Sequence, residues 1–399
     1  MSEAFANDKS IGSMQMRTPA DRHTSKGWAK APAPLQWCRP EATPLRKLSA
    51  VLAVLMLTAT AAVSSPFDRA RDLVMRKLSR RTPLPLATAT RRRAVTPPVA
   101  SACPPKVLLQ PVIDASALAL GGDLLYFSGT FDGIIRVAKD GGLPTVITPT
   151  IGEKIGPLAL DEANIYFITE DDDATGSLYS IPRSGGMPTQ LATKLPAPIA
   201  LVIDANSIYW VNVGTVIGDS FADDGSLEKI NKDGTGRQIL SNKLHTPIEL
   251  AIDATDVYVA EAGLSAGGSH AGLRRVSKSG GAVIQIYEGS LVLSVTTSAS
   301  DVFYSTLSEQ AAAVFRVSKS GGMPQTLIDD VAAFTLTISD SKLYTAVFDL
   351  FGATSIRSVP ALGGSTRIVA NVDLDTGSFA LDDCAVYYAA NLHLERAPR

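Results

Sequence analysis

The stretch LVIDANSIYWVN, residues 201–212, decides the fold because the chain repeats its pattern seven times. An apolar run leads to Asp204, and the aromatic residue Tyr209 follows five positions later. The aromatic residues recur at intervals of 40 to 49 residues, at Tyr126, Tyr166, Tyr209, Tyr258, Phe303, Tyr344 and Tyr387. Five positions before them stand Gly121, Asp161, Asp204, Asp253, Ser298, Ser339 and Asp382. These residue types bend the backbone or hydrogen-bond their own turn, so each copy predicts a tight turn between two strands.

A second pattern follows each aromatic residue, as in GIIRVAKDGGLP from Gly133 and AVFRVSKSGGMP from Ala313. Apolar residues alternate with polar or basic ones and then meet Gly-Gly or Asp-Gly. This order is typical of a strand that enters a hairpin turn with positive φ. Each unit therefore predicts four short strands in about 42 residues, which is the size of one propeller blade.

The two ends of the repeat region complement each other. The seventh copy, FALDDCAVYYAANLHLERAPR, stops at Arg399 before its fourth strand, whereas KVLLQPV, residues 106–112, matches a fourth strand but has no blade of its own. We therefore predict that residues 106–399 form an all-β, seven-bladed β-propeller of four-stranded blades, closed by this N-terminal strand. Closure would leave no unpaired inner edge. Six blades are the alternative, and they would make Tyr126 or Tyr387 a chance match.

Charge divides the chain near the same point. Residues 1–105 contain 17 Lys or Arg and 6 Asp or Glu, which leaves 20 against 33 for the remainder. The predicted propeller is therefore acidic. Because phosphate binding requires a basic surface, we expect no nucleic-acid partner.

The N-terminal part contains a segment that favours export. Residues 1–45 lack periodicity and are interpreted as a disordered or mis-assigned extension, with the start codon placed too far upstream. Residues 46–65, beginning with Arg46 and Lys47 and continuing as an apolar run, are similar to a secretory signal peptide. A transmembrane anchor is the rival interpretation, but the apolar run ends near Val63 after about 16 residues, where spanning needs roughly 20. We expect a periplasmic, cell-surface or secreted protein.

Residues 66–105 form a basic linker rich in Pro, Thr and Arg. A disordered spacer is one interpretation. The other is a membrane or envelope tether, in which Arg76, Lys77, Arg80, Arg81 and Arg91 to Arg93 hold anionic lipid or polymer. Cys103 in VASAC is a poor lipidation site, because Ala100 stands where such a site has Leu.

At IYWVN and at SLEKINKDGTGRQIL, residues 226–240, the chain resembles the YWTD-type propellers of receptor ectodomains and, more loosely, NHL-type and exported bacterial propellers. The resemblance implies a propeller fold and a binding role, with no reaction attached. The chain departs from the YWTD pattern in three respects. Only the third copy has Trp210, Asn212 stands where the family has Asp, and the YWTD ring has six blades.

Motifs for catalysis are largely missing from the sequence. It contains no Walker A loop, HExxH or CxxC motif, and GGSHA lacks the second glycine of a nucleophile elbow. His270, beside Ser269, is interpreted as an exposed loop residue. The four histidines, His23, His245, His270 and His393, look too few and too scattered for a histidine metal site.

Acidic residues gather in the loops predicted between the second and third strands of blades two to four, on the face that usually binds in propellers. The candidate ligand-binding face consists of Glu170, Asp171, Asp172, Asp173, Trp210, Asn212, Asp219, Asp223, Asp224 and Glu261. DDDATG keeps positions one, three and six of a calcium loop, but Pro182 occupies position twelve, where the bidentate Glu should be. We expect no cofactor. Calcium binding is a further hypothesis, which requires carboxylates from blades two and three to meet. The alternative is a solvated acidic loop.

Two functions follow from these residues. The first is a monomeric binding or scaffold module that engages a protein or glycan through the loop face. The second is a metal-dependent hydrolase or lactonase with its ion at the central channel. The innermost segments PLAL, IALVI, ELAI, LSVTT and LTI offer only Glu249 as a carboxylate away from the turns. We therefore favour a protein without catalytic activity.

The three cysteines lead to one predicted disulfide. Cys38 precedes the signal-like segment and would be lost on export, which leaves Cys103 and Cys384. Both are predicted on the same face of the seventh blade, and an exported protein meets an oxidising compartment. A Cys103–Cys384 bond is expected, with two buried thiols as the alternative.

Overall fold

The computed structural model describes residues 103–110, 115, 117–129, 133–148, 154–171, 174–217, 220–264, 270–308, 311–349, 354–371, 374–390 and 393–399. The predictions for residues 1–45, for the signal-like segment 46–65 and for most of the linker lie outside this part of the chain. Within it, the strands form seven four-stranded antiparallel sheets and one two-stranded sheet. No helix of the described residues is long and apolar enough to cross a membrane.

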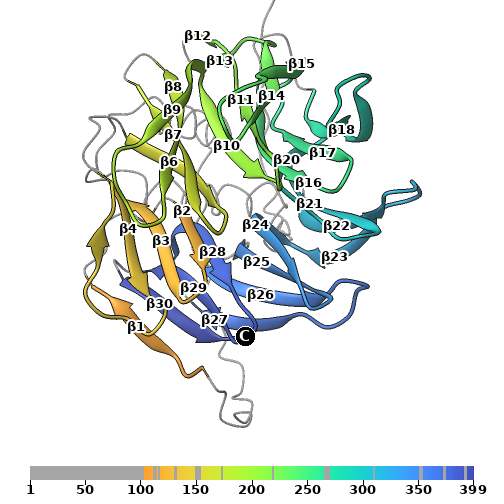
Figure 1. The fold of residues 1–399 in the computed structure, drawn as a ribbon. Coiled ribbons are helices and arrows are strands. Elements are labelled where there is room, and N and C mark those ends of the chain that lie inside the picture. The colour runs from red at the N-terminus through yellow and green to blue at the C-terminus, as the bar shows by residue number, and fades with distance from the viewer. Residues whose placement is uncertain are drawn as a thin grey trace, which may run out of the picture. The chain divides into compact units, whose positions relative to one another are not determined.

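The first four blades follow one another along the chain, each with strands in sequence order (Figure 1). Blade 1 comprises β2 (Ala117–Gly121), β3 (Leu124–Gly129), β4 (Gly133–Ala138) and β5 (Thr145–Val146). Blade 2 comprises β6 (Lys154–Leu160), β7 (Asn164–Glu170), β8 (Thr175–Pro182) and β9 (Thr189–Pro196). Blade 3 comprises β10 (Pro198–Ile203), β11 (Ser207–Asn212), β14 (Gly225–Asn231) and β15 (Gln238–Leu244). Blade 4 comprises β16 (Pro247–Ile252), β17 (Asp256–Glu261), β18 (Gly272–Ser277) and β19 (Ile284–Glu288).

The remaining three blades close the ring. Blade 5 comprises β20 (Leu291–Thr297), β21 (Asp301–Leu307), β22 (Ala312–Ser318) and β23 (Gln325–Asp329). Blade 6 comprises β24 (Val331–Ser339), β25 (Lys342–Asp349), β26 (Thr354–Pro360) and β27 (Arg367–Asn371). Blade 7 comprises β28 (Leu374–Leu381), β29 (Ala385–Ala390), β30 (His393–Pro398) and, from the other end of the chain, β1 (Lys106–Leu109). The innermost strands of neighbouring blades contact one another all the way round. The predicted seven-bladed propeller is confirmed, and the six-bladed alternative is wrong.

The repeated aromatic residues lie in the core, between the blades. None of the seven exposes more than 3% of its surface. Tyr209, for example, packs against Leu250 and Val259 of the following blade. The aromatic repeat thus provides the apolar contact between neighbouring sheets, which explains why it recurs once per blade.

Each turn aspartate organises the turn between the first and second strands of its blade. Asp204 accepts hydrogen bonds from the backbone N–H groups of Asn206 and Ser207, at 3.0 and 2.8 Å, and from the Tyr209 hydroxyl at 3.0 Å. The same three kinds of bond occur at Asp161, Asp253 and Asp382. This carboxylate therefore explains the five-residue spacing between aspartate and tyrosine.

A lysine from the next blade completes each of these turns. Lys278 of blade 4 lies 2.8 Å from the Asp204 carboxylate and 5.1 Å from the centre of the Tyr209 ring. We call this Asp–Tyr–Lys group a blade clasp, because it joins two neighbouring sheets through one carboxylate. Three further clasps pair Lys232 with Asp161, Lys319 with Asp253 and Lys139 with Asp382, at 2.6 to 2.8 Å.

In two blades without a turn aspartate, an arginine of the next blade stands where the clasps have lysine. Arg183 donates to the Tyr126 hydroxyl and to the backbone carbonyl of Gly121. Arg399 donates to the Tyr344 hydroxyl at 2.8 Å and to Ser339 Oγ at 2.6 Å. Arginine presents five donors in a planar fork, so one side chain can bond the tyrosine hydroxyl and an oxygen of the turn at the same time, and no carboxylate is needed.

The junction between blades 5 and 6 has no clasp. Phe303 has no hydroxyl, its turn residue is Ser298, and Ala361 stands at the position of the cation. Ser298 Oγ accepts a hydrogen bond from Asp301 N inside its own turn. These residues hold the turn but form no polar link to the next blade.

The Gly-Gly hairpins need glycine where they cross the outer strand of the preceding blade. Gly141 has φ of 80°, and a Cβ there would lie 2.9 Å from the Leu108 carbonyl oxygen. Gly185 has φ of 93°, and its Cβ would lie 2.8 Å from the Ile147 carbonyl oxygen. Any other residue would meet both steric strain in the backbone and a clash with the neighbouring blade.

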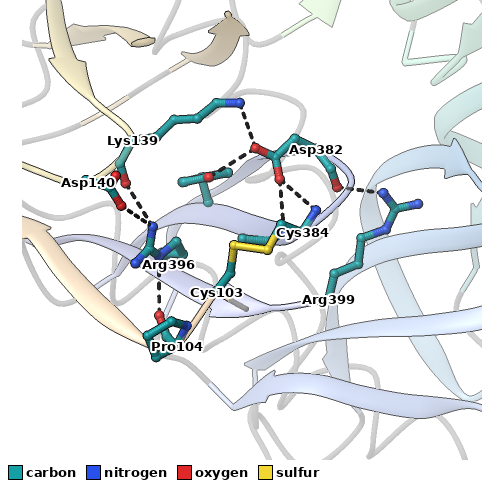
Figure 2. Close-up of a disulfide and its surroundings, with 10 residues drawn as sticks. Cys103, Pro104, Lys139, Asp140, Asp382, Cys384, Arg396 and Arg399 are labelled. Atoms are coloured by element: carbon teal, nitrogen blue, oxygen red, sulfur yellow. Dashed lines mark hydrogen bonds and ion pairs between the residues drawn. A yellow bond between two sulfur atoms is a disulfide. The ribbon is translucent and has the colours of Figure 1, made fainter. Parts of the chain in front are cut away.

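The closing blade is held by hydrogen bonds, ion pairs and a disulfide (Figure 2). β1 pairs antiparallel with β30, and Cys103 bonds to Cys384 with a Cα–Cα distance of 5.9 Å. Arg396 donates to the Pro104 carbonyl at 3.3 Å and to Asp140 of blade 1 at 2.8 Å. The disulfide expected from the cysteine positions is present, and the two-thiol alternative is wrong.

The ring has two faces. The turn face carries the aspartate turns and the Gly-Gly hairpins. The loop face carries the connections between the second and third strands and those between blades. Cys384 lies in the turn between β28 and β29, so the chain enters the propeller at the turn face.

We predict that the clasp couples its residues energetically. In a double-mutant cycle, Asp253→Asn and Lys319→Met should show a coupling energy of about 0.5 to 3 kcal/mol in urea unfolding, because the two side chains bond directly. Asp253→Asn combined with Lys139→Met, from a separate clasp, is the control and should be additive. Additivity in the first pair would refute the clasp.

The clasps also predict acid sensitivity. Partial burial raises the pKa of each aspartate, but hydrogen bonds from the lysine and the turn N–H groups outweigh it and lower the pKa of Asp161, Asp204 and Asp382 to about 2. Because these values lie below the unfolded value of about 3.9, the stabilisation is present above about pH 4 and is lost as the pH falls towards 2. Denaturant unfolding across this range should show a shallower loss in a variant with Asp161, Asp204 and Asp382 changed to Asn. An unchanged slope would contradict this assignment.

Candidate functional site

An insertion in blade 3 builds an ordered surface on the loop face. Between β11 and β14 the chain forms a hairpin of β12 (Val216–Ile217) and β13 (Ser220–Phe221). Phe221 and Val213 are fully buried and pack with Ile199 of β10 and Ile248 of β16. The insertion therefore has a small core of its own, seated on the innermost strands of blades 3 and 4.

Polar contacts tie the base of this insertion together. Asp224 accepts hydrogen bonds from Thr215 N at 2.8 Å and Thr215 Oγ1 at 2.6 Å. Val213 N donates to the Ala197 carbonyl, and Ala222 N donates to the Thr215 carbonyl, both at 2.9 Å. Ile217 is left 54% exposed at the hairpin. We call residues 213–217 and 220–224, with His245 and His270, the loop-face platform.

Glu261 anchors the platform from below. Its side chain is fully buried, lies 2.7 Å from Arg274 Nε, and accepts a hydrogen bond from His245 N at 3.0 Å. Burial raises the pKa of Glu261, opposed by the hydrogen bonds from Arg274 and from the His245 backbone. This carboxylate holds the connection between blades 3 and 4 in place and is not available to a ligand at the surface.

Two histidines meet at the edge of the platform. The rings of His245 and His270 have centres 4.8 Å apart and are tilted by 42°. His245 Nδ1 lies 3.0 Å from Asp223 Oδ1, and His270 Nδ1 lies 3.9 Å from Glu288 Oε1. His270 is exposed, as expected, but the expectation that the histidines are scattered is wrong for this pair. The contact between the two rings could not be predicted from the sequence, because each histidine lies in an irregular loop without periodicity.

The other predicted site residues do not form one surface. Glu170, Trp210 and Asn212 are buried. Asn212 Nδ2 donates to Ser226 Oγ and Glu228 Oε1, at 2.8 and 2.7 Å, inside the blade. Asp171 accepts a hydrogen bond from Thr175 at 3.0 Å. Asp172, Asp173 and Asp219 lie outside the described residues. Among the described members of the predicted face, Asp223 and Asp224 are exposed and Asp171 is half-buried, and the two histidines add to this accessible part.

The central channel is bordered by few carboxylates. Glu249 of β16 keeps partial contact with solvent although protein surrounds it, and this burial raises its pKa to about 7, against a hydrogen bond from Leu250 N. β28 of blade 7 also carries Asp375, whose side chain lies outside the described part of the structure. Blades 4 and 7 are not neighbours in the ring. In the described part of the chain, no three His, Cys, Asp or Glu residues gather closely enough to hold a metal ion.

The turn face has an open depression of about 740 Å³ between blades 4 and 5. Its lining includes Asp253, Tyr258, Arg275, Ser298 and Lys319. Asp253 and Lys319 belong to a blade clasp and satisfy each other. The lining of the depression therefore consists in part of residues that join blades 4 and 5, which gives these residues a structural role.

Comparisons with known proteins support the fold alone. The chain matches no family model and no curated protein. Among solved structures, it is similar to an oligogalacturonate lyase in complex with manganese, with a TM-score of 0.54 at 12% identity over 75% of this chain and 94% of that one. A puromycin-hydrolyzing peptidase of Mycobacterium tuberculosis is similar with a TM-score of 0.51 at 11% identity, over 68% of this chain and 47% of that one. A chain of a nidogen/laminin complex has a TM-score of 0.43 at 21% identity, over 54% of this chain and 80% of that one. At these identities the likeness indicates the fold and assigns no activity to this chain.

The anchoring role of Glu261 can be tested by stability. Glu261→Ala should lower the free energy of unfolding by about 2 to 4 kcal/mol, because it leaves Arg274, whose side chain is only 14% exposed, without its carboxylate partner. Asp223→Asn, at an exposed site of the same platform, is the control and should cost less than about 1 kcal/mol. Equal effects in chemical denaturation would show that Glu261 is not an anchor.

Proposed function

We propose that this propeller is an extracytoplasmic binding module that engages a partner protein through the loop-face platform. The observation that carries the proposal is the insertion of blade 3, which is fixed by its own core and presents Ile217 to solvent. A rigid surface loses little conformational entropy on binding, so it favours affinity. An exposed apolar residue beside polar and charged ones is also the pattern of an interface centre and its rim.

Charge suggests the kind of partner. The segment after residue 105 has 20 basic and 33 acidic residues, and one of the acidic residues, Asp223, belongs to the platform. An acidic surface speeds the approach of cationic partners. No Phe or Trp is prominent among the exposed apolar side chains of the described residues. Because sugars commonly stack on such rings, we favour a protein over a glycan.

The point of chain entry supports the choice of face. The Cys103–Cys384 bond fixes the point where the propeller begins at the turn face, so a tether through residues 66–105 would leave the loop face pointing away from its anchor. Disulfides persist in oxidising compartments, which agrees with export directed by the signal-like segment. This orientation would place the platform where a partner can reach it.

The second candidate is a metal-dependent hydrolase acting at the channel. Glu249 favours it, because a carboxyl with pKa near 7 can act as a general base. Such an enzyme would need further ligands from several innermost strands, and Asp375 on β28 is distant from β16 in the ring. We therefore place this function second.

Differential capture tests the proposed interface. The full chain would be immobilised and exposed to an extract of the cell envelope from which it derives, alongside two variants. Ile217→Asp should abolish capture of the specific partner, since it places a charge at the centre of the interface. Met323→Asp is the matched control, because Met323 is 92% exposed but lies on a turn-face hairpin. A partner retained by Ile217→Asp would refute the platform as the binding surface.

A further inference from the structure

We propose that His245 and His270 form an open binding site for a divalent transition-metal ion, with Zn²⁺ as the reference ion. Imidazole suits zinc, copper and nickel, whereas calcium and magnesium prefer oxygen ligands. The site lies at the edge of the loop-face platform, between the connection from β15 to β16 and residues 270–271, which lead into β18.

The distance between the two rings fits two ligands of one ion. A zinc–nitrogen bond is about 2.0 to 2.1 Å, so the ion would lie about 3.2 Å from the centre of each ring. Two rings at ligand angles between about 90° and 109° then have centres about 4.5 to 5.2 Å apart. The observed separation of 4.8 Å falls in this range.

Each Nδ1 faces a carboxylate, within hydrogen-bond distance for His245 and beyond it for His270. His245 Nδ1 lies 3.0 Å from Asp223, and His270 Nδ1 lies 3.9 Å from Glu288. Metal-bound histidines commonly donate their other ring N–H to a carboxylate, which fixes the ring and increases its basicity. This leaves Nε2 of each ring for the ion.

The backbone around both histidines is held by hydrogen bonds. His245 N donates to buried Glu261, and the His245 carbonyl accepts from Gly263 N at 3.0 Å. Ala271, next to His270, is buried, and its carbonyl accepts from Gly289 N at 3.1 Å. Ligands that are held before the ion arrives bind it with less loss of entropy.

Two protein ligands leave coordination positions open. The described residues offer no group of three ligating side chains, so water or a donor group of a bound partner would complete the shell. The role of the partner rests on the proposed function, whereas binding of the ion does not. Two rings in contact, with no ion between them, are the alternative that the experiment separates.

Zinc binding would be measured by isothermal titration of the purified full chain with ZnCl₂, in a Cys38→Ser background that removes the thiol outside the disulfide. We expect one Zn²⁺ per chain. His245→Ala and His270→Ala should each weaken binding at least tenfold, and Asp223→Asn should weaken it by about 10- to 100-fold. His393→Ala is the control, because His393 Nδ1 also lies near a carboxylate, 3.6 Å from Glu395, and it should leave binding unchanged.

Two results would overturn the proposal. The first is a wild-type chain that does not bind Zn²⁺, and the second is binding that survives His270→Ala. His270 is 53% exposed, so this variant should keep the melting temperature of the metal-free protein even if His245→Ala does not. Partner capture can succeed while zinc binding fails, so the two proposals are tested separately.

Discussion

The polar link from one blade's turn to the next blade is the interaction that sets the ring, and four of the seven junctions make it through a turn aspartate and two through an arginine. Neighbouring sheets share no backbone ladder, and the contact between them is largely apolar and therefore weakly directional. The aspartate carboxylate adds direction, because it binds its own turn, its own tyrosine and the lysine of the next blade at once. Because a polar link on the turn face holds six of the seven junctions, the opposite face can carry loops of different length, as blade 3 shows.

The sequence alone was sufficient for the repeat, the turns and the closure, because each depends on residues close together in the chain or on the complementary ends. The lysine partners could not be found in this way. Lys278 lies 74 residues from Asp204 and Lys319 lies 66 residues from Asp253, so their relation appears only when neighbouring blades are aligned. Aligned in this way, the chain carries a signal: arginine accompanies Gly121 and Ser339, and alanine accompanies Ser298 with Phe303.

The site was predicted less well than the fold, for a reason of orientation. Glu170, Asn212 and Glu261 are the last residues of their strands. Acidic residues near a loop do not by themselves show whether such a side chain points into solvent or towards the next blade. The register of each strand decides this, and it placed all three inside. The contact between His245 and His270 depends on the paths of two irregular loops, which no periodicity encodes.

The Cys103–Cys384 bond has a mechanical consequence. β1 has only four residues, so a pull on the chain before it would, without the bond, peel this strand from β30 one hydrogen bond after another. With the bond in place, tension passes from Cys103 directly to the turn between β28 and β29, inside the sheet. A propeller held by its N-terminal segment under flow or drag would then carry the load through a covalent link, and its closing strand would carry none.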